Sequence, residues 1–242
     1  MTPPSLASDA RVLVSLLRGH PRGDDHAANL EAFYGGQAEQ YDAFRERLLP
    51  GRQELYAGLA VAPGSRLVEL GAGTGRNLAW LGHRVADLAQ ADLVDLCEPL
   101  LAVARRRWQA HANVACHRAD ACTWQPEAPA DIVVMAYALT MIPDWQAALA
   151  NALAMLRPGG QLAVVDFTLT PEQRSVTRSF WKAWFGHDGV HPDLAHLPAL
   201  RTLLPDHEAV VAATHLPYLP GLAMPYYRFL GRKAGSATLS RI

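Results

Sequence analysis

Five short apolar segments alternate with helical segments between residues 66 and 167, and this alternation constrains the fold more than any other feature. Strands are expected at Arg66–Leu70, Ala91–Asp95, Val114–His117, Asp131–Tyr137 and Gln161–Phe167. Helices are expected from Arg76 to Leu81, over Pro99–Gln109 and over Trp145–Leu156, the last stopped by Arg157-Pro-Gly-Gly160. Strand and helix that alternate roughly every 20–30 residues indicate βαβ crossovers and a parallel sheet. We therefore predict a doubly wound α/β fold.

The region before the sheet reads differently. The apolar spacing between Asn29 and Leu59 suits two or three short helices, broken at Gly35-Gly36 and at Pro50-Gly51. We expect an N-terminal helical segment over residues 1–59 and the main domain over residues 60–242.

The region after the sheet changes again. A helix is expected over Pro171–Phe185, and residues 187–205 look rich in loops, which together give an insertion at about 171–205. Glu208–His215 and Tyr226–Arg232 then read as an antiparallel strand pair. We place this pair at the sheet edge, where prolines are tolerated.

Composition excludes several classes of protein. The 242 residues carry 22 Lys and Arg against 23 Asp and Glu, and this balance weighs against a dedicated nucleic-acid binder. Cys97, Cys116 and Cys122 form no CxxC pair, so we expect free thiols in a reducing cytoplasm. Signal-peptide features and bilayer-spanning apolar runs are both missing from the sequence. We expect a cytoplasmic protein that at most sits peripherally on the inner face of the membrane.

The strongest local signal is a glycine loop directly after the first expected strand. It reads Glu69-Leu-Gly71-Ala-Gly73-Thr-Gly75 and leads into a helical segment. Glycine allows positive φ and a close backbone approach, and amide groups at a helix N-terminus can face a ligand. A dinucleotide fingerprint, GxGxxG, would need glycine where Arg76 stands, which disfavours a dehydrogenase.

Acidic residues follow the next two strands. Asp95 ends the second strand about 20 residues past the loop, where a carboxylate accepts hydrogen bonds from ribose hydroxyls. Asp92, at the start of that strand, is a second candidate for the ribose-binding residue, but we expect its side chain to be solvated. Asp120 follows the third strand and either binds a ligand or caps a helix. The fourth strand runs into Ala138–Pro143, and ligands bind beyond the carboxyl ends of such strands.

This ordered set, completed by Leu156-Arg-Pro-Gly-Gly160, resembles the class I S-adenosylmethionine-dependent methyltransferases over residues 60–167. The resemblance implies a Rossmann-like methyltransferase sheet, mostly parallel with a C-terminal antiparallel strand pair, and S-adenosyl-L-methionine as cofactor. It also implies that Asp120 accepts from the adenine amino group. The cofactor-binding residues it implies are Tyr41, Arg45, Glu69, Gly71, Ala72, Gly73, Thr74, Asn77, Asp95, Leu96, Asp120, Ala121, Ala136, Tyr137 and Met141.

The flanks carry a closer resemblance, from about residue 30 to residue 233. Tyr41–Arg47, Gly75–Asn77, Val94–Cys97, Leu139–Trp145, Trp184–His191 and Tyr218–Tyr227 look like the N-methyltransferase component of bacterial betaine-lipid synthesis. That family trimethylates diacylglycerylhomoserine to diacylglyceryl-trimethylhomoserine. The resemblance implies a lipid amine at a membrane surface as substrate. It also points to the aminocarboxypropyl transferase that makes the homoserine lipid as a partner.

Other activities stay open on the residues alone. One is methylation of phosphatidylethanolamine or of a soluble small amine, with the same cofactor site. Another is a non-catalytic partner protein that keeps the fold, against which the intact Glu69–Gly75 loop and Asp95 argue. A third is transfer of the cofactor's aminocarboxypropyl group.

Four residues are candidates for the acceptor side of the reaction: Tyr137, His187, Asp188 and His191. They could act as a base or position the amine, and tyrosine rings could hold a quaternary ammonium by cation–π contact. His187, Asp188 and His191 could also form a structural loop or bind a metal. Gly186 and Gly189 favour a loop, and no third imidazole is placed by spacing, so we expect no metal.

The helix expected at Pro171–Phe185 carries two kinds of side chain. Arg174, Arg178 and Lys182 fall at i, i+4 and i+8 in one basic stripe, and the aromatic residues Phe180, Trp181, Trp184 and Phe185 form an adjoining face. Such a helix suits an anionic membrane interface. The alternative is that the aromatic residues pack on the sheet while the basic stripe is solvated.

Overall fold

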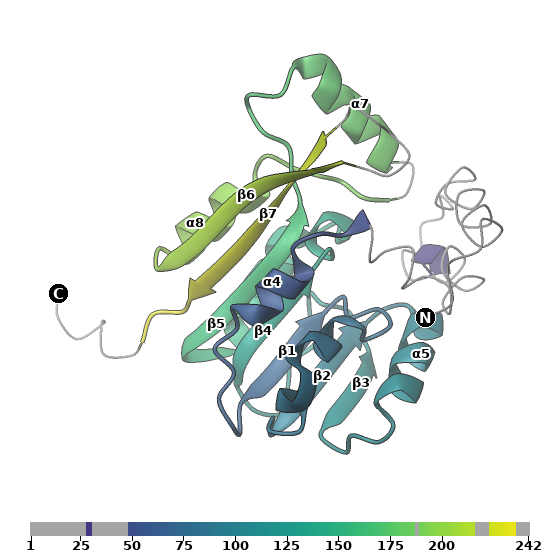
Figure 1. The fold of residues 1–242 in the computed structure, drawn as a ribbon, viewed down its shortest axis with the longest axis vertical. Helices are drawn as coiled ribbons and strands as arrows, with labels where there is room; N and C mark the ends of the chain where they lie inside the picture. Colours follow the sequence, from purple (N-terminus) through teal and green to yellow (C-terminus); the bar gives the residue numbers. More distant parts are fainter. Residues whose placement is uncertain (1–27, 31–47, 187–188, 216–222, 236–242) are drawn as a thin grey trace.

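A computed structural model describes residues 28–30, 48–186, 189–215 and 223–235. Its centre is a seven-stranded sheet in the order β3-β2-β1-β4-β5-β7-β6 (Figure 1). The strands are β1 Arg66–Leu70, β2 Gln90–Asp95, β3 Val114–Arg118, β4 Ala130–Ala136, β5 Leu156–Phe167, β6 His207–His215 and β7 Ala223–Arg232. The helices are α4 Arg52–Ala57, η1 Asn77–Val85, α5 Glu98–Trp108, η2 Leu139–Met141, α6 Trp145–Met155, α7 Ser175–Gly186 and α8 His196–Leu203.

The first five strands form the parallel part of the sheet, as predicted. β1 pairs with β2 on one side and with β4 on the other, and all the pairings among β1 to β5 are parallel. The chain therefore moves outward from β1 in one direction and then from β4 in the other. This reversal leaves a crevice outside the carboxyl ends of β1 and β4, where ligands bind in open α/β sheets.

The C-terminal strands form an antiparallel pair at one edge of the sheet, as predicted, and β6 is the outermost strand. β7 lies between β5 and β6 and pairs with each of them antiparallel. Our prediction relied on edge strands tolerating proline, yet Pro225 lies in the interior strand, opposite Ala213 of β6. The pairing of β7 with β5 ends at Tyr226 and Phe167. Pro225 therefore lies just beyond the paired residues on the β5 side, where its missing N–H costs no hydrogen bond between the strands.

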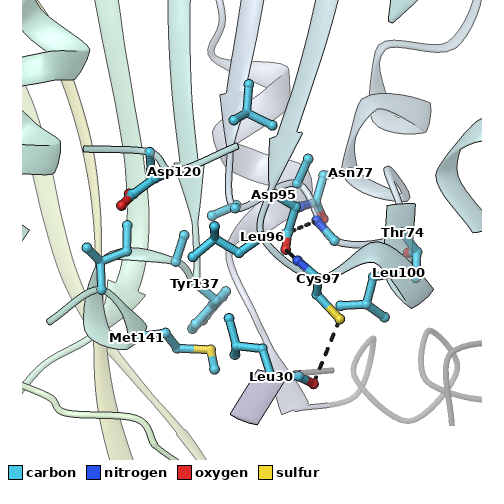
Figure 2. A pocket seen from close by; sticks show the side chains of 18 of the residues that line it. Leu30, Thr74, Asn77, Asp95, Leu96, Cys97, Leu100, Asp120, Tyr137 and Met141 are labelled. Atoms are coloured by element: carbon cyan, nitrogen blue, oxygen red, sulfur yellow. Dashed lines mark hydrogen bonds between the residues drawn. The ribbon is translucent and has the colours of Figure 1, made fainter. Parts of the chain in front are cut away.

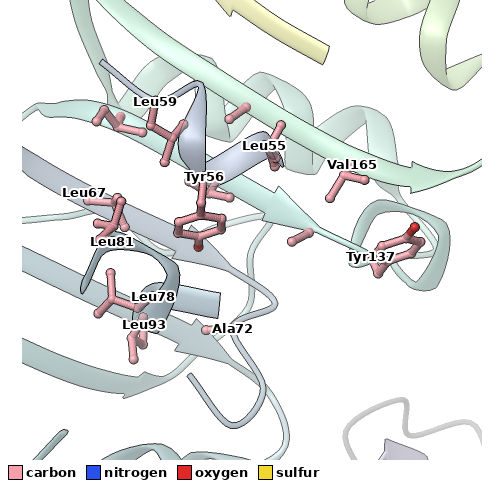
Figure 3. Close-up of a cluster of buried hydrophobic side chains, with 14 of the residues drawn as sticks. Leu55, Tyr56, Leu59, Leu67, Ala72, Leu78, Leu81, Leu93, Tyr137 and Val165 are labelled. Atoms are coloured by element: carbon pink, nitrogen blue, oxygen red, sulfur yellow. The ribbon is translucent and has the colours of Figure 1, made fainter. Parts of the chain in front are cut away.

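Two apolar clusters cover the two faces of the sheet. One contains Leu67 of β1 with residues of α4, η1, α5 and α7, and Figure 3 shows Tyr56 of α4 reaching toward Leu78 and Ala72. The other contains Val68 and Leu70 of β1 with residues of α6 and α8. Strands covered on both faces must be apolar throughout, which explains their continuous apolar runs.

Three expected elements differ in the structure. The segment after the glycine loop forms 3-10 turns in η1, and Gly82, with a φ of 58°, breaks the helical path within it. The region read as loop-rich contains α8. Pro198 hid this helix from sequence reasoning, but it lies in the first turn, where its missing N–H needs no partner. β5 already begins at Leu156, with a register shift opposite Ala130 and Ile132.

Only part of the predicted N-terminal segment lies in the residues that the structure describes. Leu55 and Tyr56 of α4 are buried against the sheet, while Arg11–Leu17 and most of residues 1–47 lie outside the described residues. The division near residue 60 therefore stays a prediction. Within the described ranges, no helix has the length and apolar character needed to cross a membrane.

Candidate functional site

A cavity of about 790 Å³ lies at the carboxyl ends of β1, β2 and β4. Its walls come from the glycine loop, the end of β2, residues 119–122 and residues 136–144, together with Leu30, Leu49 and Arg52 from the N-terminal side. In Figure 2 the labelled side chains of Asp95, Asp120, Tyr137 and Met141 surround it. The cavity coincides with the point where the strand order reverses.

Most of the predicted cofactor residues meet in this cavity. Those that line it are Gly71, Ala72, Gly73, Thr74, Asn77, Asp95, Leu96, Asp120, Ala121, Ala136, Tyr137 and Met141. They come from four separate segments of the chain, each at the end of a strand. Their common position agrees with the predicted ligand site, while each individual role stays a prediction.

The other predicted residues do not line the cavity or cannot be placed. Glu69 is fully buried and lies behind the cavity wall. Tyr41, Arg45, His187 and Asp188 lie outside the described residues.

His191 is described, but its side chain is exposed and does not line the cavity. Its backbone N–H donates to the carbonyl of Thr140 at 2.7 Å. The residue is thus attached through its backbone to η2, next to the cavity residue Met141.

The three loop glycines all have positive φ, but their surroundings differ. A Cβ on Gly71 would lie 2.4 Å from Cβ of Ala138, and one on Gly75 would lie 2.8 Å from Leu93. At Gly73 the nearest heavy atom would be 3.8 Å away, on Leu100. Close packing therefore requires Gly71 and Gly75, while Gly73 leaves room beside a wall of the cavity.

Asp95 holds the glycine loop to the end of β2. Its carboxylate accepts from the N–H of Gly73 at 2.7 Å and from the N–H of Cys97 at 2.8 Å (Figure 2). Asp92 is buried rather than solvated, contrary to our expectation, and its carboxylate contacts His117 and Gln90. Only Asp95 of the two lines the cavity.

Asp120 stabilises a turn rather than a helix, and its place in the cavity keeps ligand binding as a prediction. Its carboxylate accepts from the N–H of Cys122 at 2.8 Å, and its carbonyl accepts from Thr123 and Trp124. The residue therefore stabilises a turn after β3. It also lines the cavity, so its side chain is available to a ligand.

A buried polar chain links the cavity to Glu69. Nη1 of Arg52 donates to Oδ1 of Asn77 at 3.0 Å, and Nδ2 of Asn77 donates to Oε1 of Glu69 at 2.7 Å. Burial raises the pKa of Glu69 to about 7, although the Asn77 hydrogen bond opposes the rise. Glu69 is thus connected to the cavity through a hydrogen bond from the lining residue Asn77. Sequence reasoning missed Arg52, because no local pattern relates it to a partner 25 residues later.

Tyr137 is the only non-glycine residue with positive φ in the described part of the chain, at 56°. Its hydroxyl donates to the carbonyl of Pro50 at 2.7 Å, and burial raises its pKa well above the usual value for tyrosine. A phenol that donates a hydrogen bond and stays protonated is not a general base at neutral pH. The structure thus argues against the base role proposed for Tyr137 and leaves the role of positioning a ligand.

Asp166 at the end of β5 holds the opposite wall. Its carboxylate accepts from the N–H of Thr140 at 3.0 Å and from the Thr140 hydroxyl at 2.7 Å, and burial raises its pKa to about 6. Thr140 belongs to η2, which is followed by the cavity residues Met141, Ile142 and Pro143. Sequence reasoning missed Asp166, although a lone acidic residue near the end of an apolar strand was a signal.

The aromatic side chains of α7 do not form one face. Trp181 and Phe185 are buried, whereas Val176, Phe180 and Trp184 are 78%, 36% and 43% exposed. Phe185 packs on Phe167, which in turn packs on Tyr137, with ring centroids 4.8 Å apart in both pairs. Part of the predicted aromatic face therefore packs behind the cavity wall.

The exposed apolar stripe of α7 is also not adjoining the basic stripe. The stripe Val176, Phe180 and Trp184 is offset by two residues from the stripe Arg174, Arg178 and Lys182. In a helix with 3.6 residues per turn, such an offset places the two stripes on nearly opposite flanks.

In the part of the chain that the structure describes, no three His, Cys, Asp or Glu side chains are grouped as metal ligands.

Comparisons with known proteins agree with this geometry. Residues 67–160 match the family described as a methyltransferase domain. The ubiquinone/menaquinone biosynthesis C-methyltransferase UbiE of Shewanella woodyi is 26% identical over 155 residues, which cover 60% of this chain and 61% of the relative. That of Teredinibacter turnerae is 28% identical over 153 residues, with the same shares. The chain thus spans about three fifths of the length of these relatives.

Solved structures share the fold at low sequence identity. The N-methyltransferase NodS of Bradyrhizobium japonicum, solved with S-adenosyl-L-homocysteine, has a TM-score of 0.63 and 19% identity, and the match covers 87% of this chain and 99% of NodS. The phosphoethanolamine N-methyltransferase 2 of Haemonchus contortus has a TM-score of 0.57 and 16% identity, with 80% and 53% covered. Residues 67–160 thus match a methyltransferase domain, and the chain has the Rossmann-like fold of the solved S-adenosylmethionine-dependent methyltransferases.

Proposed function

We propose that this protein is an S-adenosylmethionine-dependent N-methyltransferase that methylates the amino group of diacylglycerylhomoserine three times. The observation that carries the methyl-transfer part is the single cavity in which the glycine loop, Asp95 and Asp120 meet. The acceptor part rests on the resemblance of the flanking segments to the betaine-lipid N-methyltransferases.

The residues of the cavity fit the cofactor. Its volume of about 790 Å³ lies in the range of small-molecule sites. Asp95 offers carboxylate oxygens for ribose hydroxyls, Asp120 offers acceptors for an adenine amino group, and Gly73 leaves space beside the loop. When bound, S-adenosylmethionine supplies an already activated methyl group. The chain then has to bind both reactants, align the amine and exclude water.

The amine must be neutral to accept a methyl group. Tyr137 stays protonated and cannot take the proton, so we propose that the amine loses it to water before it enters the cavity. The ring of Tyr137 lies in the cavity wall and would favour a growing quaternary ammonium by about 0.5–2 kcal/mol of cation–π energy. Roles for His187, Asp188 and His191 in positioning the acceptor remain predictions.

A lipid acceptor is supported by the position of α7. The exposed stripe Val176, Phe180 and Trp184 lies on a helix whose buried side packs behind Tyr137. We propose that this apolar flank, rather than the basic one, meets the membrane. The homoserine headgroup has to be made by aminocarboxypropyl transfer, so an enzyme with that activity is the proposed partner.

A second candidate function is favoured by the curated relatives, which are named as C-methyltransferases of ubiquinone and menaquinone biosynthesis. On that basis the acceptor would be a ring carbon of an apolar quinone precursor, with the same cofactor site. Phosphatidylethanolamine and soluble small amines remain alternative N-acceptors.

Mass spectrometry of the products tests these possibilities directly. Purified protein and S-adenosylmethionine are offered vesicles with diacylglycerylhomoserine, vesicles with phosphatidylethanolamine, or a polyprenylated quinone precursor. We expect gains of one, two and three methyl groups on the homoserine lipid alone. Methylation of the quinone precursor alone would overturn the N-methyltransferase proposal, and accumulation of the monomethyl lipid under excess cofactor would overturn trimethylation.

Membrane contact is tested separately by vesicle flotation. Trp184→Ser removes a 43% exposed side chain of the apolar stripe, while Leu203→Ser on α8 removes one with 45% exposure on another element. We expect only Trp184→Ser to reduce flotation. Equal flotation of both variants and the wild type would contradict the proposed role of α7.

A further inference from the structure

We propose that Arg107 and Trp108, adjacent residues at the end of α5, are positioning residues that preset the glycine loop for its ligand. This inference rests on the proposed cofactor site and adds two residues that fix the conformation of its glycine loop. Neither residue was predicted from the sequence as part of the site.

The contacts are direct. Nη1 of Arg107 donates to the carbonyl of Thr74 at 2.5 Å and to its hydroxyl at 3.0 Å. Nε1 of Trp108 donates to the carbonyl of Gly75 at 2.9 Å. Two successive carbonyls of the loop are therefore bound by two successive side chains of one helix. Each hydrogen bond fixes the orientation of a peptide group.

The other side of the loop is bound to β2. The N–H groups of Gly71 and Ala72 donate to the carbonyl of Val94 at 2.8 and 3.1 Å, and the N–H of Gly73 donates to Asp95. The loop is thus held between the end of β2 and the end of α5. Since Asp95 also lines the cavity, the hydrogen bonds to β2 and to α5 together determine the orientation of the loop toward a ligand.

Packing reinforces the hydrogen bonds at Gly75. A Cβ there would lie 3.0 Å from Nε1 of Trp108 and 3.2 Å from Cβ of Ala104, so α5 sits directly on the loop backbone. Trp108 itself is only 8% exposed. Little space remains for the loop to relax while the indole N–H keeps its acceptor.

We call Arg107 and Trp108 together the clamp. Loss of the clamp should weaken ligand binding more than it destabilises the fold. If the loop samples other conformations, the apparent affinity falls by the fraction of molecules in the competent one. A ligand would then have to order the loop at the cost of binding free energy. Saturating ligand would restore the competent loop, so KM should rise while kcat changes little.

The primary test is Trp108→Phe, which keeps an aromatic ring and removes the N–H donor. The probe is S-adenosyl-L-homocysteine, measured by calorimetry well below the melting temperature. We expect its Kd to rise about three- to tenfold, the effect of one lost hydrogen bond. Trp181→Phe is the matched control, because its buried indole N–H has no acceptor among the described residues. The control should leave the Kd unchanged.

Arg107 gives an independent arm. Arg107→Met should raise the Kd, and Arg107→Lys, which keeps one donor, should recover part of the loss. Arg105→Met is the control, since the exposed Arg105 pairs with Glu98 on the same helix. Without ligand, hydrogen exchange of the Thr74 and Gly75 amides should be faster in Trp108→Phe and in Arg107→Met than in the wild type. At saturating S-adenosyl-L-homocysteine, the exchange should slow again.

The outcomes separate this inference from the proposed function. A wild-type protein that binds no S-adenosylhomocysteine would overturn the proposed cofactor site and with it the purpose of the clamp. Binding by the wild type, together with an unchanged Kd and unchanged exchange in Trp108→Phe and Arg107→Met, would overturn the clamp alone. A lower melting temperature with an unchanged Kd would also overturn it, because that result describes a purely structural role.

Discussion

The hydroxyl of Tyr137 donates a hydrogen bond of 2.7 Å to the carbonyl of Pro50, 87 residues earlier in the chain. The bond attaches the segment that precedes α4 to the wall of the cavity. Tyr137 also has the positive φ of 56°, and its own N–H donates to Val165 of β5 at 2.7 Å. Contacts at both ends thus hold a strained residue at the site, as is common where backbone strain is kept for function.

Tyr137→Phe should lower the free energy of unfolding by about 1 kcal/mol, since it removes this hydrogen bond and keeps the ring. Tyr227→Phe is the matched control, because the buried hydroxyl of Tyr227 has no hydrogen-bond partner among the described residues. Its removal should leave stability equal or higher. Urea denaturation at one pH measures both, and equal losses in the two variants would contradict the importance of the Pro50 contact.

Gly71→Ala should both destabilise the protein and narrow the cavity. The new Cβ would overlap Ala138, at a φ of 72°, so we expect a loss of about 3 kcal/mol from overpacking and left-handed strain together. Gly64→Ala is the control, with a φ of 80° but no heavy atom within 4 Å of the new Cβ. It should cost only about 1 kcal/mol of strain. Similar losses in denaturation experiments would show that packing against Ala138 is unimportant.

Asp95→Asn should raise the Kd of S-adenosylhomocysteine about 10- to 100-fold, as expected for the loss of hydrogen bonds to a charged acceptor. The carboxylate also orders Gly73 and Cys97, so the loop loses part of its support. Asp92→Asn makes the same change on the same strand, outside the cavity, and should leave the Kd near that of the wild type. Calorimetry compares them, and an equal effect at Asp92 would argue against Asp95 as a ligand-binding residue.

Glu69 should make stability depend on pH. Its pKa is raised to about 7 in the folded protein from about 4.5, mainly because of burial, so the folded state binds the proton more tightly. The associated stability is present below about pH 4.5 and is lost as the pH rises through 7. Glu69→Gln has no such proton to lose. Its stability relative to the wild type should therefore rise between pH 4.5 and pH 7.

Denaturation of the wild type and Glu69→Gln at four pH values between 4.5 and 8 measures this difference. The comparison removes the contribution of Asp166, whose pKa is also raised, because both proteins contain it. A difference in stability that stays constant across the range would show that Glu69 keeps an ordinary pKa.

The sequence alone determined the parallel half of the sheet and the place of the site. The strand Arg66–Leu70 was predicted with the bounds that the structure has, and the other four parallel strands were found with shifted ends, because strands covered on both faces need unbroken apolar runs. The glycine loop and Asp95, which line the cavity, were singled out for a similar reason, because each lies where a strand ends. The α/β fold of S-adenosylmethionine-dependent methyltransferases was predicted from these signals and is confirmed.

Only the tertiary structure decided which polar groups support the cavity. Arg52 reaches Asn77, Asp166 holds Thr140, and Trp108 binds Gly75 across separations of 25 to 33 residues. It also decided that Trp181 turns inward while Trp184 stays exposed, and that Pro225 lies in an interior strand. Strand and loop signals are local, so they can be read along the chain. A buried hydrogen bond depends on where distant segments meet, and that is set by the packing of the whole domain.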